Sequence, residues 1–171
     1  FTTLIRREVE NVKAGKDGYI LLKMNGLQDI PLVEELYRAS EAGVQIDLII
    51  RGICILKPEQ PYSKNIRVIR IVDRFLEHAR VFVFHNDGNP KVFMGSADWM
   101  KRNLTRRIEC VFPIYEKELK EELMDVLNIQ LSDNVKASLI DENLQNVRIR
   151  NEQPSLRSQR ATYEYFREKY S

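Results

Sequence analysis

A strand–helix–strand pattern near the start of the chain most constrains the fold. Residues 19–25 (YILLKMN) and 44–51 (VQIDLIIR) are apolar runs of strand length, and the second is rich in β-branched residues. The segment between them has helical spacing, with Asp29 as a candidate N-cap and Gly43 as a stop. Such a unit places its two strands parallel and adjacent in one sheet. We therefore expect an α/β fold.

The rest of the chain predicts further strands and helices of the same fold. Asp87 and Gly88 are typical of a hairpin turn. Residues 132–153 show only a weak pattern, and no internal repeat or linker divides the chain. The spacing predicts helices at 2–16, 116–131 and 155–170, strands at 66–72, 80–85, 91–96 and 106–115, and a short connection at 73–78. We expect residues 1–171 to form a single α/β domain, with a mixed β-sheet flanked by helices.

The first residue, the length of the apolar runs and the cysteines bear on the cellular location of the protein. The chain opens at Phe1 rather than at methionine, so we expect it to be a fragment of a longer chain. No apolar run approaches the roughly 20 residues of a membrane-spanning helix. Cys54 and Cys110 lack metal-ligand spacing, which favours a reducing cytoplasm. Association of the full-length protein with a membrane surface stays open.

Charge is distributed unevenly along the chain. Residues 51–107 carry 12 Lys and Arg against 5 Asp and Glu, although the whole chain has a formal charge of only +2. A basic middle between acidic flanks indicates an anionic ligand, such as a phosphate or a nucleotide. A solvated basic face without a ligand explains the same counts, so charge alone does not decide.

His78 is the main candidate for chemistry, because the chain has only two histidines and His85 opens the hairpin turn. His78 precedes a predicted strand, and Arg74 and Arg80 lie close to it in sequence. An imidazole can attack phosphorus, donate to a leaving oxygen or hold a phosphate oxygen, and guanidinium groups neutralise phosphate charge. A structural histidine at the start of a strand is the alternative.

The order His-x-Arg, hairpin, Gly-Ser-x-Asp resembles half of the phospholipase-D-like motif, His-x-Lys-(x)4-Asp followed by Gly-Ser-x-Asn. Here Arg80 replaces the lysine, His85 stands where the aspartate is expected, and Ser96 and Asp98 belong to the second half of the motif. Ser96 and Asp98 either hydrogen-bond within the site or shape the turn. The two departures argue against a simple phosphodiesterase half-site.

A closer resemblance covers essentially the whole chain. The segments that carry it are ILLKMNGL, DLIIRGICILKP, IVDRFLEHARVFVF, GSADWMKRN, RRIE and DENLQN, with an Arg-rich C-terminal helix. In this order and spacing they resemble the C-terminal part of bacterial polyphosphate kinase, an ATP–polyphosphate phosphotransferase built on a phospholipase-D-like core. The resemblance implies a single phospholipase-D-like domain, the second of two that face each other.

The resemblance also implies roles for individual residues. The histidine that becomes phosphorylated belongs to the other domain. His78 corresponds to the second active-site histidine, Arg51 to an arginine on the nucleotide phosphates, and Glu109 to an acidic residue near the phosphorylated histidine. The implied partners are ATP, inorganic polyphosphate and the remaining domains of the same chain, in a homo-oligomer when full length. Magnesium would come with ATP; no residue here is expected to hold a metal, and nucleic acid is not an expected partner.

The residues themselves point to the same edge of the sheet. Arg51 ends the second strand of the strand–helix–strand unit, and ligands of open α/β sheets gather at the carboxyl ends of strands. Lys23 and Asn25 end the first strand, so they and Arg80 are candidate phosphate-binding residues. Glu109 is a lone carboxylate in a predicted apolar strand, and a cationic imidazole would satisfy it.

We therefore expect one domain of a polyphosphate kinase, which is inactive or nearly so in isolation. It would help to transfer the terminal phosphoryl group of ATP to polyphosphate through a phosphohistidine on the other domain. Two other classes of function stay open. One is a phospholipase-D-like nuclease that dimerises to bring two copies of His78 together, and the other is a non-catalytic polyanion-binding module.

Overall fold

One mixed sheet of eight strands organises the protein. The computed structural model describes residues 1–171, and the strands follow the order β6-β5-β4-β1-β2-β3-β7-β8 across the sheet. The strands are β1 (Tyr19–Met24), β2 (Gln45–Ile50), β3 (Ile66–Ile71), β4 (Arg80–Phe84), β5 (Lys91–Gly95), β6 (Val111–Ile114), β7 (Ala137–Ile140) and β8 (Asn146–Arg148). The helices are α1 (Thr2–Lys13), α2 (Ile30–Glu41), α3 (Lys101–Thr105), α4 (Lys117–Leu131) and α5 (Ser158–Lys169). The α/β fold with a mixed sheet is confirmed.

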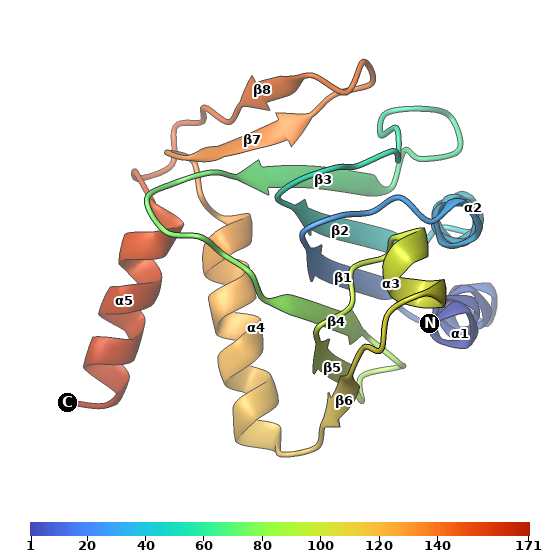
Figure 1. Cartoon of the computed structure of the whole chain (residues 1–171), viewed down its shortest axis with the longest axis horizontal. Helices are drawn as coiled ribbons and strands as arrows, with labels where there is room; N and C mark the ends of the chain where they lie inside the picture. Colours follow the sequence, from blue (N-terminus) through green and yellow to red (C-terminus); the bar gives the residue numbers. More distant parts are fainter.

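The centre of the sheet is parallel and its two sides are antiparallel. β1 pairs with β2 and β2 with β3 in parallel, whereas β4, β5, β6, β7 and β8 all join as antiparallel strands. In Figure 1 the arrowheads of β1, β2 and β3 therefore point to the same side, and the arrowhead of β4 points the other way. The carboxyl ends of β1 and β2 thus meet the start of β4 at one edge.

Helices cover both faces of the sheet (Figure 1). Alternate β1 residues, including Ile20 and Leu22, pack in one core cluster with Ile5 of α1 and residues of α2. Leu21 belongs to a second cluster with Leu127 of α4 on the opposite face. Residues at successive strand positions point to opposite faces, so a strand buried on both sides reads as a continuous apolar run.

The predicted helix ends and turn are confirmed. The Asp29 carboxylate accepts a hydrogen bond of 3.1 Å from the backbone N–H of Leu32, which caps α2. Gly43, just after α2, has a φ of +102°, a conformation that favours glycine. Asn86, Asp87 and Gly88 also have positive φ in the β4–β5 hairpin.

Three details differ from the sequence prediction. The strand predicted at 106–115 is ordered as a strand only over Val111–Ile114, and the short helix α3 precedes it. The weakly patterned stretch 132–153 contains the β7–β8 hairpin, which lies at the edge of the sheet. All three β8 residues are exposed, so β8 lacks the alternating pattern by which strands are predicted. No helix of the structure is long and apolar enough to cross a membrane.

Candidate functional site

The predicted edge of the sheet brings together residues from four strand ends. Asn25 follows β1, Arg51 follows β2, His78 lies shortly before β4, and Ser96 follows β5. Parallel β1–β2 pairing aligns Met24 with Ile50, so Asn25 and Arg51 leave the sheet at the same level. The expectation that Asn25 and Arg51 leave the first two strands at one edge is confirmed.

Arg51 is held between Asn25 and His78. Its Nε donates a hydrogen bond of 2.9 Å to Oδ1 of Asn25, and its Nη2 lies 3.5 Å from Nδ1 of His78. The Nη1 group has no hydrogen-bond partner within the chain, and the His78 residue is exposed. One end of the guanidinium is thereby fixed while the other keeps free donors, an arrangement suited to binding an oxyanion.

Asp98 is the buried anchor beneath this edge. Its carboxylate accepts hydrogen bonds from Arg80 Nε (3.2 Å) and Nη2 (3.0 Å), and from the backbone N–H groups of Asn25 (2.7 Å) and Gly26 (3.2 Å). Arg80 Nη1 also donates to the backbone oxygen of His78 at 2.8 Å. Asp98 and Arg80 therefore tie together the end of β1, the start of β4 and the His78 backbone.

The electrostatics of Asp98 follow from this geometry. Burial raises the pKa of the Asp98 carboxyl, but hydrogen bonds from Arg80 and the Asn25 amide outweigh burial and leave its pKa below the ordinary value. Its side chain is 5% exposed and that of Arg80 is 11% exposed. Arg80 is thus engaged within the protein, and its direct binding of phosphate stays a prediction.

Glu109 is exposed enough to meet a partner, but two neighbours already orient it. The Ser96 hydroxyl donates to Oε2, and Asn103 Nδ2 donates to Oε1 at 2.6 Å. The hydrogen bonds from Ser96 and Asn103 lower the pKa of Glu109, which keeps it an anion. The predicted apolar strand around Glu109 is wrong, because Glu109 precedes β6. Its role toward a second histidine stays a prediction.

Lys23 lies on the face of the sheet that α4 and α5 cover. Its side chain is 8% exposed, and its Nζ donates a hydrogen bond of 2.7 Å to Glu77 Oε2. Lys23, Glu77 and Gln130 line a hollow of about 240 Å³ there. The ammonium group of Lys23 is therefore paired within the chain, and phosphate binding by Lys23 stays a prediction.

The pairing of Lys23 with Glu77 can be tested by stability. We expect Lys23→Met in the full-length protein to lower stability by roughly 1–3 kcal/mol, because the Glu77 carboxylate loses its cation. The double variant Lys23→Met, Glu77→Gln should recover much of this loss. Thermal unfolding of the parent, the single variants Lys23→Met and Glu77→Gln, and the double variant measures these changes in stability. A variant of normal stability with only a raised KM would instead make Lys23 a phosphate ligand.

Several residues of the site carry no signal in the sequence. The roles of Asn103 and Glu77 depend on contacts to segments that are distant or irregular, and neither residue belongs to a periodic pattern. Asp98 was singled out by the Gly-Ser-x-Asp motif, and the structure places it within the site. Trp99 and Met100 are buried and belong to the packing.

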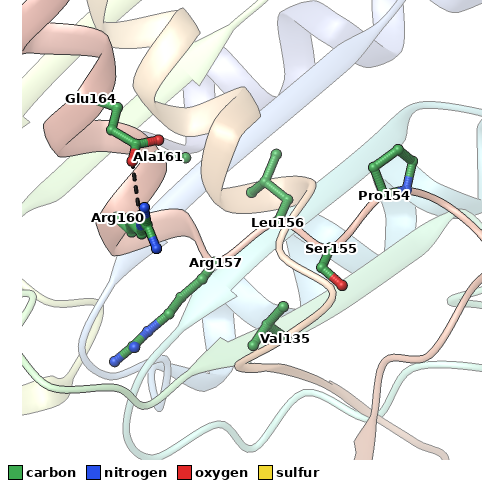
Figure 2. Close-up of a pocket in the computed structure, with 8 residues that line it drawn as sticks. All are labelled: Val135, Pro154, Ser155, Leu156, Arg157, Arg160, Ala161 and Glu164. Atoms are coloured by element: carbon green, nitrogen blue, oxygen red, sulfur yellow. Dashed lines mark hydrogen bonds and ion pairs between the residues drawn. The ribbon is translucent and has the colours of Figure 1, made fainter.

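A larger hollow than the one beside Lys23 lies elsewhere, around the start of α5 (Figure 2). It has a volume of about 540 Å³ and is lined by Val135, Pro154, Ser155, Leu156, Arg157, Arg160, Ala161 and Glu164. Arg160 Nε lies 2.9 Å from Glu164 Oε1. Figure 2 shows this pair and Arg157 extending away from the other lining residues. Its arginines are not aimed at a common point. The residues at the Arg51 edge do not line it.

Comparison with known proteins agrees with the motifs. The family model described as polyphosphate kinase C-terminal domain 2 matches residues 1–159. The polyphosphate kinase of Vibrio cholerae is 51% identical over 166 residues, which are 96% of this chain and 24% of that protein. That of Halalkalibacterium halodurans is 53% identical over 138 residues, 80% of this chain and 20% of that protein. The chain spans about a quarter of the length of such relatives.

Two solved structures are similar to this chain, one in both sequence and fold and the other in fold alone. The polyphosphate kinase of Porphyromonas gingivalis superimposes with a TM-score of 0.97 at 56% identity, over 98% of this chain and 26% of that one. The phospholipase D family member Nuc of Salmonella typhimurium has a TM-score of 0.53 at 16% identity, over 82% of this chain and 88% of that one, and shows the fold alone. The fold is therefore phospholipase-D-like, and the chain belongs to the polyphosphate kinase family, within its C-terminal domain 2.

Proposed function

We propose that this domain forms one half of the active site of a polyphosphate kinase. The enzyme would transfer the terminal phosphoryl group of ATP to a histidine of the other catalytic domain and then to polyphosphate. The observation that carries the proposal is the Arg51–His78 pair at the open edge of the sheet, with Nη1 of Arg51 unpartnered. In phosphoryl transfer, catalysis comes mainly from positioning and charge neutralisation, which such a pair can supply.

In the proposed mechanism, Arg51 and His78 act on neighbouring oxygens. The guanidinium of Arg51, fixed at Nε by Asn25, would hold phosphate oxygens with its remaining N–H groups. Since Arg51 only donates, the Nδ1 atom of His78 that faces it is suited to accept, which leaves the proton on Nε2. With that proton, Nε2 would donate to the bridging oxygen as this becomes the leaving oxygen. Arg80, Asp98 and Lys23 would hold the backbone that carries these groups.

Glu109 would orient the phosphorylated histidine of the opposing domain. The Ser96 hydroxyl donates one hydrogen bond to Oε2, and the Asn103 amide donates one to Oε1. Each oxygen keeps a further lone pair that can accept from an imidazole N–H. The surface beside the site supports a covering domain, because Ile108 is fully exposed next to Glu109 and Ile53 is 54% exposed near Arg51. Isoleucines in these positions are suited to contact with the rest of a longer chain.

Other parts of the proposal concern the complete protein. Magnesium would enter with ATP as part of the substrate, and polyphosphate would be the acceptor. The chain offers no group of three or more His, Cys, Asp or Glu that could hold a metal, so no step is assigned to a protein-bound ion. We also propose a cytoplasmic location and a homo-oligomer for the full-length protein, and little or no activity for the isolated domain.

Two residue types argue against the nuclease alternative. The phospholipase-D-like motif has a lysine and an aspartate after its histidine, whereas this chain has Arg80 and His85 at those positions. Arg80 is, in addition, engaged by Asp98. The chain therefore lacks both of these groups.

Arg51→Lys tests the proposal, because lysine keeps the charge and loses the paired donors. In the full-length protein we expect polyphosphate synthesis from ATP to fall at least about tenfold in kcat, or about 1.4 kcal/mol, with a smaller loss of ATP affinity. Part of the contact with phosphate strengthens only in the transition state, so turnover falls more than binding. Steady-state kinetics beside a direct ATP-binding measurement decide this.

Arg67→Lys is the matched control. Arg67 lies on β3 at the opposite end of the strands and pairs with Asp47 at 2.6 Å, so this exchange should leave kcat unchanged. Equal losses of turnover and affinity in Arg51→Lys would mean that Arg51 only holds substrate. No loss in either quantity would place Arg51 outside the site and overturn the proposed function.

A further inference from the structure

The segment 72–79, which carries His78, has no helix or strand of its own. It connects β3 to β4 on the side where the arrowheads of β1, β2 and β3 point (Figure 1). Its apolar residues contribute little to the core, because Val72, Phe75 and Leu76 are 65%, 66% and 71% exposed. Burial therefore does not hold this segment in place, and its position depends on polar contacts.

The start of α5 makes the first of these contacts. Arg157, the residue before α5, donates to both oxygens of Asp73, with Nε and Nη2 at distances of 2.7 Å and 2.5 Å. The Asp73 side chain is 2% exposed, so this two-pronged ion pair closes over a buried carboxylate. The contact explains why Arg157 extends away from the other residues that line the hollow in Figure 2. It fixes the first part of segment 72–79.

Gln159 on α5 holds the middle of the segment. Its Oε1 accepts a hydrogen bond of 2.9 Å from the Phe75 backbone N–H, and its Nε2 donates to the Phe75 backbone oxygen at 2.8 Å. The side-chain amide thus pairs with both backbone groups of one residue, as a neighbouring strand would. Nε2 also donates to Glu77 Oε1 at 3.1 Å, and Glu77 Oε2 accepts from Lys23 of β1. Glu77 directly precedes His78.

α5 is itself attached to the rest of the fold at its start. The buried carboxylate of Asp133 accepts hydrogen bonds from the Ser158 backbone N–H at 2.8 Å and the Ser158 hydroxyl at 2.6 Å. A chain of polar contacts therefore runs from the core through Asp133 and α5 to Gln159 and the residue before His78.

We propose that Gln159 is a positioning residue, which sets His78 against Arg51 by fixing the backbone at Phe75 and the side chain of Glu77. The inference rests on the proposed function, in which His78 acts on a phosphate oxygen. A catalytic group displaced by about 1 Å can lose about a hundredfold in rate, so contacts one and three residues before His78 are enough to matter. Gln159 does not touch the substrate, and its effect passes through His78.

Gln159→Ala in the full-length protein tests this role. We expect kcat for polyphosphate synthesis to fall about tenfold, while KM for ATP and for polyphosphate stays within about twofold, because Arg51 is untouched. Hydrogen exchange of the Phe75 amide should accelerate at the same time, since that amide loses its acceptor. Gln159→Glu should lose more turnover, because a carboxylate replaces the donor facing Glu77 and the Phe75 oxygen. Glu168→Ala, at an exposed position of α5 whose side chain makes no hydrogen bond or ion pair, is the control and should match the parent.

The double variant with His78→Ala separates the two proposals. If Gln159 acts through His78, adding Gln159→Ala to His78→Ala should cause no further loss of kcat. A further tenfold loss in the double variant would overturn the positioning role, as would normal turnover of Gln159→Ala beside a slow His78→Ala. Normal turnover of His78→Ala would instead overturn the proposed function itself.

Discussion

His78→Ala in the full-length protein is expected to lower the rate of polyphosphate synthesis by about 10²–10⁴, which is the usual contribution of one acid–base group. The exposed imidazole lies 3.5 Å from Arg51, so it can reach a phosphate held by that arginine. The segment that carries it is fixed by its backbone and by Glu77, so removal of the ring should leave the fold intact. Steady-state synthesis and thermal unfolding are the measurements.

His85→Ala is the matched histidine control, because His85 lies beyond the other end of β4. It should retain the turnover of the parent. A folded His78→Ala variant with near-normal turnover would contradict the assignment of the site. Unfolding of that variant would make His78 a structural residue.

Asp98→Ala should give the largest loss of stability of any single change at the site, about 3–5 kcal/mol. It leaves the Arg80 guanidinium without its carboxylate in a place where that side chain is 11% exposed. It also removes the acceptor of the Asn25 and Gly26 backbone N–H groups. Hydrogen exchange of β1 and β4 amides in the full-length protein measures the free energy of opening.

Removing both charges should lower stability by less than the sum of the two single changes, so Asp98→Ala with Arg80→Met is the informative double variant.

The stability of the protein in acid provides a second test. The pKa of Asp98 is lowered in the folded state, so its stabilising contribution is present above its unfolded-state pKa of about 3.9 and is lost as pH falls through the folded-state pKa. The Asp98→Ala variant, which lacks this carboxylate, should therefore lose less stability on acidification than the parent. Additive costs and an unchanged acid response would contradict the role of Asp98 as the charged anchor.

The parts of the fold with strong periodicity could be predicted from the sequence. The strand–helix–strand unit fixes β1, α2 and β2, and parallel pairing brings the residue after each strand to one edge. Asn25 and Arg51 therefore lie together, as predicted. The β7–β8 hairpin and α3 were not predicted, because they are short, exposed elements at the margins of the sheet.

The partners within the site could be predicted less well. Lys23 and Arg80 carry charges expected to face a phosphate, yet each is paired with a carboxylate of the chain. Sequence spacing cannot show such a pair, because Lys23 and Glu77 belong to different elements that meet only in the folded protein. The same holds for Gln159, whose only sequence signal is its place on a predicted helix.

Besides His85, two positions of the phospholipase-D-like motif differ in this chain, and their side chains contact each other. Arg80 stands at the lysine position and Asp98 at the asparagine position, and the two form one ion pair. Arg80 and Asp98 neutralise each other at a largely buried place, so neither charge is left without a partner there. The pair also holds the end of β1 and the His78 backbone.

Rapid-quench phosphorylation with terminally labelled ATP tests the half-site proposal most directly. In full-length protein, we expect the parent to place label on a histidine outside residues 1–171 before polyphosphate forms. In His78→Ala, the same histidine should be labelled, at a rate at least about 100-fold lower. An unchanged rate of labelling in this variant, or label on His78 in the parent, would contradict the proposal.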